Sequence, residues 1–422
     1  SPAVSISSYP EKAAKEEFTL SGTVSDNIGV KSVVITDSLD SSKSYKATVN
    51  GGTWSVTLKP TAQGEGENET KDGSHTYTAV ATDKVGNTSN AACRVTTDTT
   101  APYWYTGNKD LAEPYISTKS SSEKITVSDV EYSLYNSASV TVAAKAKDAT
   151  TSVSNLLYNL NDEKDDSSAL VWKSADNGNF SVENLSEGVN TLKIKAVDEA
   201  GNENTAVALS FFVDSAAPAE PELKSVDSDS DESSMTDFAA QNKQKLVNGK
   251  EDVTFTVAVE DDISSGEKAY SGIASVELTK IGNKTLSASV SGTFVSEKNG
   301  KSVYSITIPH ENLASGSATV TVKDKAGNAT TLGMFNFLLD SKAPTVLLSS
   351  PAGDVNKTIS LSGSATDNQE IDEETLRLEY STDNSSWESL SSENAGSKYK
   401  AVISDSAITV TEFDTTKFDD NS

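Results

Sequence analysis

The chain has few of the residues from which most catalytic centres and nitrogen- or sulfur-ligated metal centres are built. Its 422 residues include one cysteine, Cys93, and two each of histidine, methionine and arginine. A single cysteine excludes an intrachain disulfide and a thiolate cluster. His75 and His310 share no motif, and no nucleophile elbow or phosphate-binding loop is present. We therefore expect no enzymatic activity.

Positive charge and long apolar runs are also scarce. There are 62 acidic residues against 35 basic ones, which gives a formal net charge of −27. Nucleic acids and anionic membranes bind basic surfaces, so neither is an expected partner. No apolar stretch reaches the roughly 18 residues that a membrane-spanning helix needs, so direct membrane insertion is not expected either. The carboxylates favour cations as ligands and keep an exposed protein in solution.

What the chain has instead is an internal repeat. A pattern Asp-x-x-Gly-Asn occurs three times, and each copy is followed after a short apolar run by Asp-x-x-Ala-Pro. The final asparagines are spaced by 115 and then 126 residues, the length of one small domain. The first pattern covers residues 83–87, 198–202 and 324–328, and the second covers 98–102, 214–218 and 340–344.

We accordingly expect four domains, named here repeats 1 to 4: residues 1–101, 102–217, 218–343 and 344–422. Repeat 2 has an aromatic insertion at its start, and repeat 3 has an acidic and helical one. Repeat 4 matches the front half of repeat 1 but has no Asp-x-x-Gly-Asn pattern, so we expect it to be incomplete, with its last strands missing. The chain starts within a linker pattern, because Ser1-Pro2 aligns with Ala343-Pro344, and this indicates a fragment of a longer protein.

Apolar and polar residues alternate within each repeat. Phe18, Leu20, Gly22 and Val24 are typical of a half-buried antiparallel strand. Strands that run into a Gly-Asn turn form hairpins, because these two residues tolerate a positive φ. The alternation also covers residues 140–144, 253–259 and 359–363. It is present as well in the three segments that run into the Gly-Asn turns, residues 77–81, 192–196 and 318–322.

These strands predict an all-β protein of tandem β-sandwich domains. The Ala-Pro linkers restrict the backbone and contain no flexible Gly/Ser tether. We therefore expect an elongated rod.

Repeat 1 carries a resemblance to a known family. Residues 50–58, Asn-Gly-Gly-Thr-Trp-Ser-Val-Thr-Leu, together with residues 72–89, resemble the bacterial immunoglobulin-like repeats of large cell-surface proteins and adhesins. Residues 179–182 and 188–192 are similar in repeat 2. The resemblance implies immunoglobulin-like sandwiches, an extracellular or cell-surface location on a bacterium, and a non-enzymatic stalk or adhesin segment.

Two alternative functions remain open. One alternative is a structural subunit of a surface layer or extracellular filament. The other is a set of accessory spacer domains in a secreted polysaccharide-active enzyme. The expected partners are neighbouring copies of the chain, other surface proteins or glycans.

Alternating aspartates open repeat 3 at Asp227, Asp229 and Asp231. This spacing matches the first ligands of an EF-hand calcium loop, but Glu232 and Phe238 stand where that loop needs glycine and a bidentate glutamate. We prefer a solvated acidic loop and keep calcium as the alternative. The following segment, 236–247, predicts a short helix capped by Thr236.

Other aspartates recur from repeat to repeat at strand ends and linkers. Calcium at the repeat junctions is one interpretation. We prefer the other, in which each aspartate caps a turn through its own backbone and no cofactor is needed. The recurring sets are Asp26, Asp83 and Asp98, then Asp148, Asp198 and Asp214, then Asp262, Asp324 and Asp340.

Aromatic residues gather in the insertion at residues 103–137. They form either a stacking platform for a sugar or protein ligand, or a contact between a linker and the neighbouring repeat, and we prefer the contact. The residues are Tyr103, Trp104, Tyr105, Tyr115, Tyr132 and Tyr135.

Overall fold

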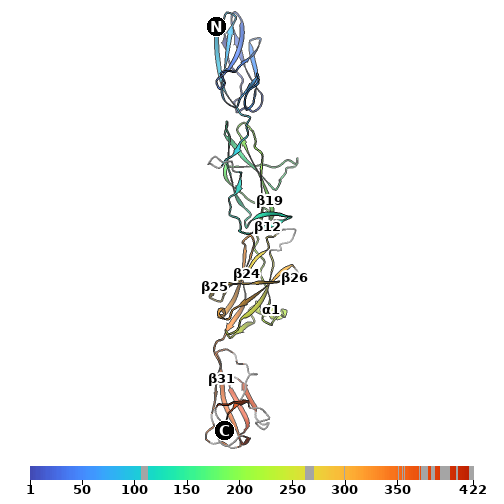
Figure 1. The fold of residues 1–422 in the computed structure, drawn as a ribbon, viewed down its shortest axis with the longest axis vertical. Coiled ribbons are helices and arrows are strands. Elements are labelled where there is room, and N and C mark those ends of the chain that lie inside the picture. Colours follow the sequence, from blue (N-terminus) through green and yellow to red (C-terminus); the bar gives the residue numbers. More distant parts are fainter. Residues whose placement is uncertain are drawn as a thin grey trace. The chain divides into compact units, whose positions relative to one another are not determined.

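In the part of the chain that the structure describes, the protein is all-β, with one short α-helix (Figure 1). The computed structural model describes residues 1–422 apart from 106–112, 262–269, 299, 350, 354, 356, 370, 372–378, 382–384, 390–399, 405–406 and 418–422. The chain divides into two compact units. The first holds residues 1–219, 261–274 and 323–329, and the second holds 220–260, 275–322 and 330–422.

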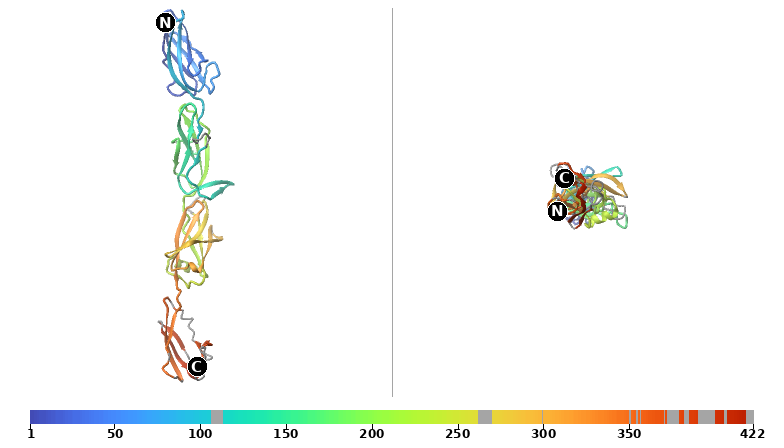
Figure 2. Two further views of the ribbon diagram at one scale, coloured as in Figure 1. Left: turned by 60° about the vertical axis from the view of Figure 1, so that its left-hand side comes forward. Right: turned by 90° about the horizontal axis from the view of Figure 1, so that it is seen from below.

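Repeat 1, drawn in blue in Figures 1 and 2, is a sandwich of two sheets. One sheet has the strand order β1-β2-β6-β5, with β7 beside β6, and the other has the order β4-β3-β8-β9. Trp54, Tyr77 and Cys93 lie in the core between them. The strands are β1 (Ala3–Val4), β2 (Phe18–Ser25), β3 (Val30–Asp37), β4 (Ser44–Lys46), β5 (Thr48–Asn50), β6 (Thr53–Pro60), β7 (Glu69–Thr70), β8 (Gly73–Asp83) and β9 (Thr88–Thr97).

Repeat 2 has a six-stranded sheet of order β12-β13-β20-β19-β16-β17, a three-stranded sheet β11-β14-β18, and the pair β10-β15. Trp104, Leu156 and Phe211 belong to its core. The strands are β10 (Tyr103–Trp104), β11 (Tyr115–Ile116), β12 (Lys124–Val127), β13 (Val130–Tyr135), β14 (Val140–Ala144), β15 (Ala146–Lys147), β16 (Val153–Leu160), β17 (Lys173–Ala175), β18 (Gly178–Val182), β19 (Gly188–Asp198) and β20 (Val207–Val213).

Repeat 3 pairs a sheet of order β21-β23-β27-β26 with one of order β22-β29-β28-β24-β25. Its strands and helices are β21 (Glu222–Val226), α1 (Glu232–Ala239), β22 (Gln244–Val247), β23 (Val253–Val259), β24 (Ile273–Ile281), β25 (Lys284–Ser291), β26 (Thr293–Lys298), β27 (Lys301–Ile308), the 3₁₀ turn η1 (His310–Asn312), β28 (Gly316–Asp324) and β29 (Ala329–Leu339).

Repeat 4 contains a sheet of order β30-β31-β35-β34 and the pair β32-β33. Ala365, Ile408 and Val410 form its buried cluster. The elements are β30 (Thr345–Leu348), β31 (Thr358–Thr366), β32 (Glu379–Tyr380), β33 (Glu388–Ser389), β34 (Lys400–Ser404), β35 (Ala407–Asp414) and the 3₁₀ turn η3 (Thr415–Lys417).

The strands and hairpins expected from the sequence are confirmed. Strands β2, β14, β23 and β31 cover the alternating segments, and β8-β9 and β19-β20 are antiparallel hairpins closed by Gly-Asn turns. Gly86, Gly201 and Gly327 have φ of 95°, 83° and 102°, which a residue with a Cβ rarely adopts. Within the described residues, no helix is long and apolar enough to cross a membrane.

The predicted helix of repeat 3 exists but lies earlier in the chain than expected. Asp231 caps it by accepting from the N–H of Ser234 at 2.7 Å, so Thr236 is inside the helix. Gln241, with φ of 62°, follows its end. The lysine-containing segment that was expected to be helical is β22, which pairs in parallel with the end of β29.

Candidate metal centres

The aspartate of each Asp-x-x-Gly-Asn pattern caps its own hairpin. In repeat 1, Asp83 Oδ1 accepts from the N–H groups of Val85 and Asn87 at 2.9 Å, and Asp83 Oδ2 accepts from the Asn87 side chain at 2.8 Å. In repeat 2, Asp198 accepts from both the main-chain N–H and the side-chain amide of Asn202 at 2.9 Å. These bonds confirm that the hairpin aspartates Asp83 and Asp198 cap their turns, as expected from the sequence.

At the start of repeat 2, however, the aspartates do more than cap turns. Asp98 directly follows β9, Asp148 directly follows β15, and Asp198 ends β19. One carboxylate oxygen from each lies within 4.8 Å of the other two. Asp98 is 0% exposed and Asp198 is 2% exposed, so water screens their charges poorly. The linker of repeat 1 thus brings a carboxylate to two carboxylates of repeat 2, and we call this set centre 1.

The same arrangement recurs with Asp214, Asp261 and Asp324, which we call centre 2. One carboxylate oxygen from each again lies within 4.8 Å of the others. Asp214 follows β20 and is 0% exposed, and Asp324 ends β28 and is 2% exposed. The sequence alignment assigned this position to Asp262, which lies outside the described residues. Among the described residues, Asp261 is the one that lies with Asp214 and Asp324.

Direct contacts hold each linker against the hairpin that follows it. The side-chain amide of Asn202 donates to the main-chain oxygen of Asp98 at 3.0 Å, and that of Asn328 donates to the main-chain oxygen of Asp214 at 2.8 Å. At centre 1, Lys15 Nζ also donates to the main-chain oxygen of Gly201 at 2.5 Å.

The electrostatics of both centres oppose three ionised carboxylates. Burial raises the pKa of Asp98, and the charges of Asp148 and Asp198 raise it further. Burial likewise raises the pKa of Asp324, with a further contribution from Asp214. At Asp83, where no linker carboxylate is present among the described residues, hydrogen bonds from Asn87, Val85 and Gly86 outweigh burial and the pKa is lowered.

Both centres also contain a buried oxygen without a protein partner. Within the described part of the chain, Asp148 Oδ2 and Asp214 Oδ1 are buried and accept no hydrogen bond. A buried carboxylate oxygen left unpaired is costly. Turn capping alone therefore does not explain why these oxygens converge.

A cation would satisfy them. Calcium binds carboxylate oxygens at about 2.3–2.6 Å, so two of its ligands lie at most about 5 Å apart. The oxygens of each centre lie within 4.8 Å of one another, close enough to share one such ion. A donor set made only of carboxylate oxygens favours a hard cation over zinc, which is typically bound by nitrogen or sulfur. Three carboxylates supply three to six oxygens, and water would supply the rest of the six to eight.

The three aspartates at the start of repeat 3 are not brought together in this way. Asp227 Oδ2 pairs with Lys245 at 2.5 Å, Asp229 Oδ2 pairs with Lys243 at 3.3 Å, and Asp231 caps α1. Each carboxylate has its own partner within the fold. Calcium at this loop stays a prediction.

The aromatic residues at the start of repeat 2 have separate surroundings. Trp104 is 8% exposed and belongs to the core of its own repeat, whereas Tyr103 is 42% exposed. Lys147 Nζ lies 3.6 Å from the centroid of the Tyr105 ring. Tyr103 and Trp104 also line a cavity of about 560 Å³ beside the start of β20. Their role in binding a ligand or a neighbouring repeat stays a prediction.

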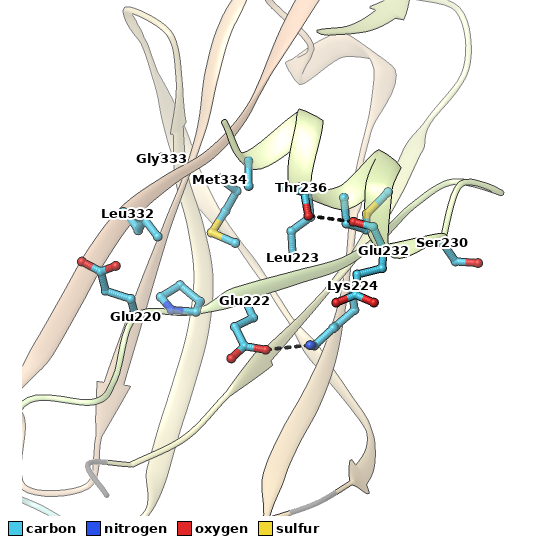
Figure 3. Close-up of a pocket in the computed structure, with 13 residues that line it drawn as sticks. Glu220, Glu222, Leu223, Lys224, Ser230, Glu232, Thr236, Leu332, Gly333 and Met334 are labelled. Carbon is cyan, nitrogen blue, oxygen red and sulfur yellow. Dashed lines mark hydrogen bonds and ion pairs between the residues drawn. The ribbon is translucent and has the colours of Figure 1, made fainter. Parts of the chain in front are cut away.

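Repeat 3 contains a cavity of about 700 Å³ (Figure 3). It lies between β21, α1 and β29, with Met334 from the strand and Thr236 from the helix on its walls. Glu222 on its rim pairs with Lys224 at 2.6 Å and also with Lys301, and these bonds lower the pKa of Glu222. Glu220 and Glu232 also line the cavity, so its rim is acidic.

The two histidines lie in unrelated surroundings. His75 is buried, with Nδ1 2.8 Å from Asp37 Oδ2, whereas His310 is half-exposed beside Asp252 and Glu311. No sequence signal identified the Asp37–His75 pair. Its formation depends on the β3-β8 pairing, which places Asp37 opposite Tyr77.

No protein-family model matches the chain, and no curated protein matches it. Solved structures with similar folds include a tetra-tandem repeat from the extending region of a large adhesion protein. That structure is 21% identical and has a TM-score of 0.29, with 86% of this chain and 80% of that chain covered.

Two further solved structures are also similar. One is the fibronectin(III)-like modules of Clostridium thermocellum CbhA, at 15% identity and a TM-score of 0.26, covering 50% of this chain and 94% of that one. The other is the ICAM-5 D1–D4 ectodomain fragment, at 9% identity and a TM-score of 0.33, covering 94% of each chain.

Proposed function

We propose that this chain is a non-enzymatic extracellular spacer, a stalk or adhesin segment on a bacterial surface, in which calcium fixes the junctions between successive sandwich repeats. The observation that carries the proposal is the convergence of three carboxylates at two successive junctions. Each centre takes one ligand from a linker and two from the repeat that follows. A cation bound there would hold consecutive repeats in one orientation.

The chemistry of the centres supports an extracellular setting. Calcium sites of extracellular modules work at about 10⁻⁴–10⁻³ M, where a few carboxylates suffice. Repeat 1 resembles the bacterial immunoglobulin-like repeats of large surface proteins, which agrees with this setting. The chain would thus act through its length and the stiffness of its junctions.

The first experiment is to titrate calcium into the full chain by calorimetry after removing divalent cations. We expect two sites, and we expect the heat-unfolding transition of the junction repeats to rise in calcium. Saturation at about 100 times Kd contributes about 2.7 kcal/mol per site. Absence of both effects would rule out the calcium role.

Single variants connect each site to its residues. Asp98→Asn is expected to remove centre 1 and leave centre 2, and Asp214→Asn to do the reverse. Asp176→Asn, at an exposed aspartate of repeat 2, is the control and should keep both sites. If Asp98→Asn and Asp214→Asn both bind calcium like the control, the sites lie elsewhere.

A further inference from the structure

Repeat 1 carries two of the three parts of such a centre at the end of its sandwich that holds the Asp-x-x-Gly-Asn hairpin. Asp26 Oδ1 accepts from the N–H groups of Ile28 and Gly29 at 2.8 and 3.0 Å. In centre 1, Asp148 Oδ1 accepts from Thr150 and Thr151 at the same two distances. Asp26 therefore has the local conformation of a centre ligand.

The other carboxylate oxygen of Asp26 also resembles its counterpart in centre 1. Among the described residues, Asp26 Oδ2 is buried and has no hydrogen-bond partner, like Asp148 Oδ2 in centre 1. Asp83, the hairpin aspartate, is 2% exposed, as Asp198 is in centre 1. Among the described residues, no third carboxylate meets Asp26 and Asp83 as Asp98 meets Asp148 and Asp198.

The hairpin asparagine of repeat 1, Asn87, makes fewer side-chain hydrogen bonds than its counterparts in repeats 2 and 3. The amides of Asn202 and Asn328 each bond both their own hairpin aspartate and the main-chain oxygen of a linker. In the described part of the chain, the amide of Asn87 bonds only Asp83, and Asn87 is exposed. One amide hydrogen thus remains available for a linker carbonyl.

Exposed apolar side chains flank these groups. Ile28 is 58% exposed in the loop after Asp26, and Val85 is 70% exposed in the hairpin. Burying two such side chains under a partner would be favourable by about 25 cal/mol per Å² of apolar surface.

Strand register leads a linker to this position. Tyr103, the residue after Pro102, pairs with Lys147, the residue before Asp148. Ala3, the residue after Pro2, pairs with Ser25, the residue before Asp26. An aspartate four positions before Pro2 would therefore lie beside Asp26, in the way that Asp98, four positions before Pro102, lies beside Asp148.

We propose that this end of repeat 1 is an acceptor for the Asp-x-x-Ala-Pro linker of another immunoglobulin-like repeat, joined head to tail. The linker would bring its carboxylate to Asp26 and Asp83 and its main-chain oxygen to Asn87, and a calcium ion would complete the centre. The inference rests on the proposed calcium role of centres 1 and 2.

The test adds the missing ligand to the full chain. The residues Asp-Thr-Thr-Ala, taken from the linker of repeat 1, are placed before Pro2 in the position of Ser1. Calorimetric titration should then find three calcium sites, against two for the unextended chain. An extension of Asn-Thr-Thr-Ala is the matched control and should keep two.

A second variant ties the new site to repeat 1. Asp26→Asn in the extended chain should return the count to two while centres 1 and 2 still bind, which also shows that the chain is folded. Two sites in both the extended and unextended chains would overturn this inference and leave the proposed function intact. No calcium binding by the unextended chain would overturn the proposed function itself.

Discussion

The side-chain amide of Asn202 donates to the main-chain oxygen of Asp98, 104 positions earlier in the chain. The same amide also bonds Asp198, so one asparagine links the hairpin of repeat 2 to the linker of repeat 1. Asn328 repeats this geometry with Asp214 and Asp324. The asparagine of the Gly-Asn turn therefore both closes its own hairpin and contacts the linker of the preceding repeat.

Removing this contact should loosen the junction locally. Asn202→Ala deletes two hydrogen bonds, one of them to a carboxylate, and we expect a loss of about 2 kcal/mol in local stability. Amide hydrogen exchange of residues 96–102 in the full chain would measure it as faster exchange. Asn87→Ala, which removes the hairpin contact in repeat 1, is the control and should leave exchange of that segment unchanged.

The pH dependence of centre 1 follows from the raised pKa of Asp98, which burial and then the neighbouring carboxylates cause. A carboxyl whose pKa is higher in the folded state contributes stability below its ordinary range near 3.8, and loses that contribution as the pH rises through the folded-state pKa. We therefore compare the melting temperature of the native chain with that of the Asp98→Asn variant, both in the presence of a chelator. The advantage of the native chain should be largest in acid and should fall toward neutral pH.

Saturating calcium should reverse that trend, because the cation binds the ionised carboxylates. Melting curves of both chains from pH 4 to 7.5, with chelator and with calcium, test the sign. A difference between the chains that does not vary with pH in either condition would contradict the assignment.

The buried pair of His75 and Asp37 should be important to repeat 1. His75 Nδ1 lies 2.8 Å from Asp37 Oδ2, and both side chains are almost fully buried. His75→Ala leaves the buried Asp37 carboxylate with the N–H of Leu39 but without a cationic partner, and breaking a buried pair costs about 3–5 kcal/mol. Thermal unfolding should show a destabilised repeat 1. His310→Ala, at a half-exposed histidine, should leave the melting profile unchanged.

The acidic loop of repeat 3 offers a test of the EF-hand interpretation. The combined variant Asp227→Asn, Asp229→Asn and Asp231→Asn should keep the calcium stoichiometry of the native chain, since these carboxylates bond lysines or cap α1. Asparagine can still cap the helix, so the fold is expected to persist. Loss of one calcium site in calorimetry would instead show that the loop binds calcium.

The sequence allowed prediction of the β-sandwich class, the hairpins and the capping role of Asp83, because period-two alternation and Gly-Asn turns are local signals. The convergence of Asp98 with Asp148 and Asp198 is not local. It depends on how a linker docks on the next hairpin, which no spacing in the sequence specifies.

Other parts of the fold also depend on tertiary packing. The comparison of the repeats placed Asp262, which lies outside the described residues, with the strand-end aspartates, and it gave no sign that Asp261 meets Asp214 and Asp324. The segment with Lys243 and Lys245 suggested the end of a helix. Instead it leads into β22, because pairing with β29 outweighs helix propensity there.

Each centre draws on a linker with a fixed number of residues between its aspartate and its proline. Duplicating the whole of repeat 2 would retain a complete centre at each junction from repeat 1 to repeat 3, so such a chain can gain length in steps of one domain. One residue inserted between Asp98 and Pro102 would instead move the carboxylate by about 3.4 Å, more than a metal–oxygen bond length. Copy number can therefore vary freely in such a chain, whereas linker length cannot.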